Sequence, residues 1–116
     1  MNIFSYIFLF TIVLLSPLSS MEKIVDTVKN VDLIVADKFN QKGEKIGVDY
    51  YALNRNQSQP AMVSVNVSKS NNVYEGLVSG RTILDPEKKT HLGWIVQIDS
   101  KEDGFWFVEW SVELDE

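Results

Sequence analysis

The chain has 116 residues and no cysteine, and 16 acidic residues against 11 Lys and Arg residues give it a formal net charge of −5 at pH 7. Nucleic-acid binding depends chiefly on Lys and Arg, so an acidic chain without a basic stripe argues against a nucleic-acid partner. Without cysteine, disulfides and a lipid-modified cysteine are excluded, and burial of the core alone must stabilise the fold.

The first segment of the chain predicts export. Residues 1–20 hold an apolar run, Ile3–Leu15, followed by Pro17 and the small residues Ser19 and Ser20. The run is shorter than the roughly 20 apolar residues that span a bilayer, and an apolar core followed by small residues is typical of a secretory signal. We therefore expect a helical signal peptide at 1–20, a periplasmic or secreted location, and no stable membrane span after cleavage. An uncleaved anchor is the alternative, because no Lys or Arg precedes the apolar run.

From residue 21 onward, apolar residues recur at every second position, which is typical of half-buried antiparallel strands. Strands are expected over VDLIVADKF (31–39), KIGVDYYALN (45–54), AMVSVNVS (61–68), HLGWIVQID (91–99) and FWFVEWSVEL (105–114). A weaker strand is expected over 80–84, and 22–29 is either an edge strand or a short helix. About seven short strands separated by turns predict an all-β, immunoglobulin-like antiparallel sandwich, in one domain over 21–116.

The same alternation predicts a candidate contact face. In the strands 91–99 and 105–114 it turns one set of side chains inwards, namely Leu92, Trp94, Val96, Ile98, Trp106, Val108, Trp110, Val112 and Leu114. Ile95, Phe105 and Phe107 then fall on the opposite face, where pairing of the two strands would join them in one apolar patch. Exposed patches of this kind often mark contact sites. Coverage of the patch by another strand, or by residues 22–29, is the alternative.

The residue inventory predicts no catalytic, cofactor-binding or metal site. His91 is the only histidine, and neither H-x-H, H-E-x-x-H nor C-x-x-C is present. No G-x-S-x-G sequence marks a nucleophilic serine. Residues 99–104, DSKEDG, resemble part of a calcium loop but lack its spacing and closing Glu, so a charged hairpin turn is expected there. We therefore predict that the protein is not an enzyme.

The order of strands and turns resembles the small β-domain that precedes the catalytic domain in some exported bacterial lysostaphin-like zinc peptidoglycan endopeptidases. The matching elements are an A-x-N strand end, a Pro before a V-x-V-x strand, an Asn-Val pair, a Pro turn, an apolar strand and a final aromatic strand. Here they are Ala52 and Asn54, Pro60 with Val63 and Val65, Asn72 with Val73, Pro86, Leu92–Ile98 and Phe105–Leu114. These motifs specify strands and turns, so Asn54, Pro60, Asn72 and Pro86 are assigned to turn geometry without a binding role.

The family's peptidase domain binds zinc through H-x-x-x-D and H-x-H motifs, and this sequence contains neither. The resemblance therefore implies a non-catalytic exported cell-envelope module that acts through protein–protein contacts, docking to or modulating a peptidoglycan-active enzyme. The expected partner is an envelope protein, with peptidoglycan as a second candidate. The alternative is a cell-wall or carbohydrate-binding module, which requires solvent-facing aromatic rings on which sugars stack.

Overall fold

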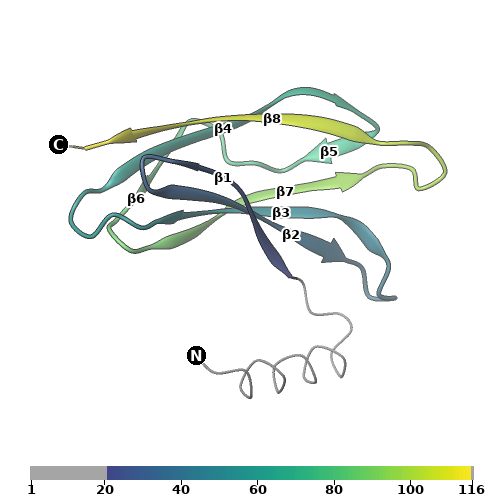
Figure 1. Ribbon diagram of the computed structural model, residues 1–116. Coiled ribbons are helices and arrows are strands. Elements are labelled where there is room, and N and C mark those ends of the chain that lie inside the picture. Colours follow the sequence, from purple (N-terminus) through teal and green to yellow (C-terminus); the bar gives the residue numbers. More distant parts are fainter. Residues whose placement is uncertain (1–20, 116) are drawn as a thin grey trace, which may run out of the picture.

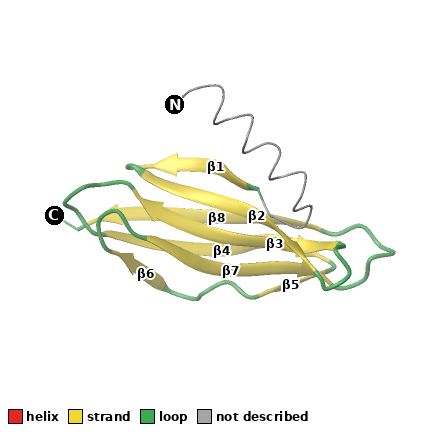
Figure 2. Cartoon of the chain, turned by 90° about the horizontal axis from the view of Figure 1, so that it is seen from below, coloured by secondary structure: helices red, strands yellow, loops and turns green. Residues whose placement is uncertain are grey.

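The computed structural model describes residues 21–115, which form eight β-strands and no helix, as the all-β prediction expects. The large sheet has the strand order β1 (Glu22–Val28), β2 (Val31–Phe39), β3 (Lys45–Asn54), β7 (Lys89–Gln97) and β5 (Val73–Glu75). The small sheet has the order β6 (Arg81–Leu84), β4 (Ala61–Asn71) and β8 (Phe105–Leu114), and every pairing is antiparallel. Figure 1 shows the two sheets as stacked layers, and Figure 2 looks onto them, so that their strands overlap in that view. The predicted signal peptide at 1–20 lies outside the described residues.

Residues 22–29, for which the sequence allowed either an edge strand or a short helix, contain the edge strand β1. It pairs with β2, and the register shifts between Ile24 and Asp26, so Val25 forms a bulge. Ile24 and Val25 are 57% and 48% exposed. Figure 2 shows β1 at one margin of the large sheet, with β5 at the other.

The core lies between the sheets and follows the predicted alternation in β3 and β4. Val48, Tyr50 and Ala52 are buried from the large sheet, while Ala61, Val63 and Val65 are buried from the small one. The side chains between them along each strand are partly or fully exposed, and Asn54 at the end of β3 continues the buried face. Burying these aliphatic side chains between two sheets is the main stabilising contribution in a domain without disulfides.

Asn54 anchors two turns beneath the surface at one end of the sandwich. Its side chain is fully buried, and its amide nitrogen donates to the carbonyl oxygens of Gln59, Leu84 and Asp85 at 2.9, 3.1 and 3.3 Å. Its amide oxygen accepts from the backbone N–H of Asn56 at 3.0 Å. The residue therefore satisfies the turn after β3 and the turn after β6 together, in agreement with its predicted turn role.

Asn72 marks the point where the chain passes from one sheet to the other. It is the single residue between β4 and β5, and its φ of 60° lies in the left-handed region that Asn tolerates better than most residues. Its side chain donates to the carbonyls of Asp99 and Glu102 at 2.8 and 3.1 Å and accepts from the N–H of Asp99. These hydrogen bonds hold the charged turn after β7 against the β4–β5 crossover.

A bulge in β7 changes the predicted alternation of that strand. Tyr50 lies opposite Gly93 and Tyr51 lies opposite His91, so Leu92 is an extra residue. Gly93 has a φ of 130°, and a Cβ at this position would collide with the carbonyl of Gly76. After the bulge the faces are exchanged, and the prediction that Trp94 and Val96 face the core with Leu92 is wrong.

Candidate functional site

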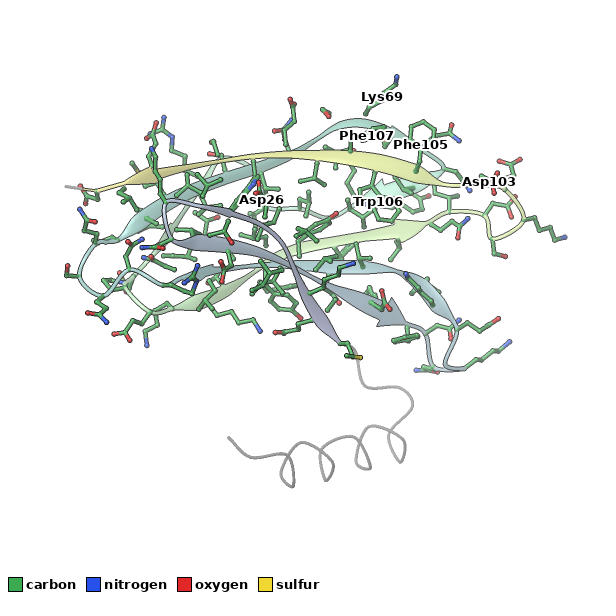
Figure 3. All side chains as sticks on the ribbon, in the orientation of Figure 1. Asp26, Lys69, Asp103, Phe105, Trp106 and Phe107 are labelled. Carbon is green, nitrogen blue, oxygen red and sulfur yellow. The ribbon has the colours of Figure 1, made fainter. Side chains whose placement is uncertain are left out.

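Phe105 and Phe107 form an exposed pair on the outer face of the small sheet. They are 43% and 59% exposed, and their ring centroids lie 6.0 Å apart at a tilt of 58°. Across the strand pair, Phe107 lies opposite Lys69 and Phe105 lies opposite Asn71. Figure 3 shows both rings on the side of β8 that points away from the large sheet, while Trp106 points toward it. These two residues are called the Phe patch below.

The third residue of the predicted contact face, Ile95, is not exposed. It is fully buried in the core, opposite Val48. Two assumptions fail: the bulge at Leu92 turns Ile95 inwards, and β7 belongs to the large sheet whereas β8 belongs to the small one. The pairing of 91–99 with 105–114, on which a patch of all three residues depended, does not occur. The candidate contact face is reduced to the Phe patch, whose role in contact remains a prediction.

A groove of about 320 Å³ runs between the edge strands β1 and β8, beside the Phe patch. Its walls come from three strands of the large sheet and from β8, and its lining residues are Val25, Asp26, Leu33, Tyr50, Trp106, Phe107, Val108 and Trp110. The inner side chains of β8 from Trp106 to Trp110 are only half-buried. Apolar side chains of the small sheet thus reach solvent along this margin.

Two tryptophan hydrogen bonds join the sheets across this groove. The indole N–H of Trp110 donates to Oδ2 of Asp26 at 2.8 Å, and that of Trp106 donates to the Tyr50 hydroxyl at 2.9 Å. Burial raises the pKa of the Tyr50 phenol above its usual 10.0, and the hydrogen bond from Trp106 opposes this shift without cancelling it. Trp106 and Trp110 face inwards as the alternation predicts, and the indole N–H of each is hydrogen-bonded to the large sheet.

The most chemically suggestive polar group is the pair of His91 and Asp49 on the outer face of the large sheet. His91 Nε2 lies 2.9 Å from Asp49 Oδ1, and Lys38 Nζ lies 3.9 Å from the same oxygen. The Tyr51 ring packs against His91 at 4.9 Å, with Lys89 Nζ 4.9 Å from the centre of that ring. Among residues 21–115, no serine or threonine hydroxyl is hydrogen-bonded to His91. The group forms a network of polar and charged side chains on the surface of the large sheet.

Other candidate features of the sequence are also located. Within residues 21–115, no group of three or more His, Asp or Glu side chains is arranged to hold a metal ion. In the same part of the chain, no helix has the length and apolarity that a membrane crossing requires. In the predicted charged turn at 99–104, the Asp99 side chain accepts the N–H of Lys101 at 2.9 Å, as turn residues commonly do.

Sequence reasoning missed the groove, because Asp26 and Trp110 are separated by 84 residues. The local sequence around Asp26 gives no signal of its partner. Asp26 follows Ile24 and Val25 in an apolar segment, but it is exposed in β1, so its sequence position alone suggests a solvated charge. Recognising its partner requires knowing that β1 and β8 lie on the same margin of the sandwich.

Comparison with known proteins found no matching family model, no similar curated protein and no similar solved structure. The resemblance to the β-domain of lysostaphin-like endopeptidases therefore remains a prediction from strand and turn motifs.

Proposed function

We propose that the protein is a non-catalytic, exported cell-envelope module that acts through protein–protein contacts, docking to or modulating a peptidoglycan-active enzyme. The observation that carries this proposal is the Phe patch, in which two large apolar rings lie side by side at the surface. Neighbouring exposed aromatic side chains are enriched at protein interfaces, because they bury a large area when a partner covers them.

Other features support parts of the same proposal. Export is supported by the apolar run Ile3–Leu15 and the small residues that follow it. Two antiparallel sheets around one core support the immunoglobulin-like assignment, an architecture common among contact domains. The carboxylate of Asp32 is 1% exposed and accepts hydrogen bonds from the Thr27 hydroxyl and the Arg55 guanidinium at 2.7 and 2.9 Å. This buried acidic group therefore has a structural role.

The alternative, a cell-wall or carbohydrate-binding module, has less support from Trp106, Trp110 and Tyr51, although Tyr74 is 61% exposed. Sugar binding by stacking needs an open aromatic face. Trp106 and Trp110 face the groove with their indole N–H groups bonded across it, and Lys89 lies over the Tyr51 ring. If this alternative were correct, peptidoglycan fragments would shift tryptophan emission. The protein-contact proposal expects no shift.

The experiment is site-specific photocross-linking in the native host. A photoreactive phenylalanine analogue replaces Phe107 in the full chain, and the same analogue at Ile83 is the control. Ile83 is 67% exposed on β6, the opposite edge of the same sheet. We expect cross-links from position 107 to a peptidoglycan-active enzyme and none to that enzyme from position 83. Identical products from both positions, or cytosolic proteins alone, would contradict the proposal.

A further inference from the structure

The free edge of β8 exposes a regular row of backbone hydrogen-bonding groups. Among the described residues, β8 pairs with β4 on one side and with no strand on the other. Successive residues of a strand direct their N–H and C=O groups to alternate sides. Asp115 donates its N–H to Pro60, and the Phe107 carbonyl accepts from the Ser68 hydroxyl, so odd-numbered residues face β4. The backbone groups that point away from β4 are those of Trp106, Val108, Trp110, Val112 and Leu114.

This edge differs from the other edges of the described sandwich. Proteins protect edge strands by keeping them short, by covering them, or by placing bulges, Pro or charged side chains, especially Lys, in them. β5 and β6 have three and four residues, and β1 has seven residues with Lys23 and the bulge at Val25. β8 has ten residues without Pro or Lys, and the irregularity in its pairing falls at Ser68 of β4. Within residues 21–115, β8 is therefore the longest edge strand, and its only charged residues are Glu109 and Glu113.

Charge indicates what kind of strand this edge would accept. From Glu102 to Asp115 the chain carries five acidic residues and no basic one, including Glu109 and Glu113 on the exposed face of β8. Opposite charges across a strand pair are stabilising, and like charges directly opposite are destabilising. A second copy of β8 would add the same acidic residues to one sheet. A strand with Lys or Arg on its outer face would instead pair with Glu109 and with Glu113, whose carboxylate also lies 3.8 Å from the Arg81 guanidinium of β6.

We propose that β8 binds an extended segment of a partner protein, in which Lys or Arg alternates with aliphatic residues, as a fourth strand of the small sheet. The basic side chains lie beside Glu109 and Glu113, and the aliphatic ones enter the groove against Val25, Leu33 and Val108. Main-chain hydrogen bonds supply affinity in such strand addition, and alternate side chains supply specificity. The inference rests on the proposed function, since it names the partner's chemistry and its mode of contact.

The first test uses hydrogen exchange in the full chain, followed by NMR. The probe is a soluble peptide as long as β8 in which Lys alternates with Val, and a Glu–Val peptide of the same pattern is the control. At a Lys–Val concentration of about ten times Kd, we expect exchange of the Val108, Trp110 and Val112 amides to slow about tenfold, because only the free fraction exchanges. Binding that leaves these three amides unchanged would overturn the strand-addition mode.

The second test separates the charge argument from the edge argument. We expect the double variant Glu109→Gln, Glu113→Gln to bind the Lys–Val peptide about fivefold more weakly, given the modest energy of exposed cross-strand charge pairs. Glu75→Gln is the matched control, because Glu75 is exposed on β5 at the far margin of the large sheet. Equal affinity of the wild-type chain for the Lys–Val and Glu–Val peptides would overturn the basic-partner assignment.

A third comparison distinguishes failure of this inference from failure of the proposed function. If cross-linking at position 107 identifies an envelope enzyme but the β8 amides stay unprotected in that complex, the Phe patch docks without strand addition and the inference fails alone. If neither occurs, both fail. If the even-numbered amides of β8 become protected in the complex, strand addition is supported with the natural partner.

Discussion

At the residue scale, the side chain of Asn54 is fully buried, and its amide atoms form hydrogen bonds with two separate turns. Few other side chains could replace it there, because both the donor and the acceptor are used. Its sequence position next to a turn suggested a turn role, but not that it would also hold the turn after β6. That second contact joins residues that are 30 positions apart in the chain. Neither the alternation of apolar residues nor the composition of a turn predicts such a distant contact.

We expect Asn54→Ala to lower the free energy of unfolding by about 3 kcal/mol, because it leaves buried carbonyl groups without donors. The measurement is urea denaturation followed by circular dichroism. Asn66→Ala is the matched control, since Asn66 is exposed in β4, and its effect should stay within about 0.5 kcal/mol. Similar losses for the two variants would show that the buried amide has no special role.

Tyr50 gives the fold a predictable response to alkaline pH. Its pKa is raised by burial in the folded state, so folding favours the protonated phenol. This contribution to stability is complete below the unfolded pKa of about 10 and is lost as the pH rises through the higher folded pKa. Tyr50→Phe should therefore lose less unfolding free energy than the wild type between about pH 9 and about pH 11. Tyr74→Phe, at a 61% exposed position, is the control and should follow the wild type.

At the element scale, β7 is a strand in which two-residue periodicity does not predict which side chains face the core. The faces of β3, β4 and β8 follow the alternation, because each of those strands keeps one phase along its inward residues. In β7 the extra residue Leu92 exchanges the faces and carries Ile95 into the core. A glycine inside a strand often marks a bulge or a close backbone approach, so Gly93 was the available signal. Deciding between those readings needs the position of Gly76, which lies in another part of the chain.

We expect Gly93→Ala to destabilise the protein by about 2 kcal/mol or more, because an L-residue at this φ is strained and its Cβ meets the backbone of Gly76 and Leu77. Gly104→Ala is the matched control, because the nearest atom to its added Cβ would be the Asn72 carbonyl oxygen at 3.4 Å. Thermal unfolding of the two variants tests the difference. A tolerated Gly93→Ala would contradict the assigned bulge geometry.

At the scale of the whole molecule, the sheets have five and three strands, and their edges β1 and β8 meet across an open groove. Periodicity predicts that two sheets form, but it does not report which strands stand at the margins. Strand order depends on pairings between distant segments, such as β3 with β7. The Phe patch was found from one strand alone, whereas the groove beside it depends on this order.

The bond between Asp26 and Trp110 should control how firmly β1 is held against the small sheet. We expect Asp26→Ala to speed amide exchange in β1 while changing the global unfolding free energy by less than about 1 kcal/mol, as befits one exposed hydrogen bond. Asp26→Asn keeps an acceptor oxygen and should preserve most of the protection. Equal acceleration in β4 would show a global rather than a local effect.

The crossover at Asn72 also has a mechanical consequence. Because only Asn72, in a left-handed conformation, separates β4 from β5, the two sheets are joined there by a very short covalent link. A pulling force applied to one sheet is therefore carried into the other by covalent bonds, in addition to side-chain packing. At that end of the sandwich, this short link limits how far one layer can move relative to the other.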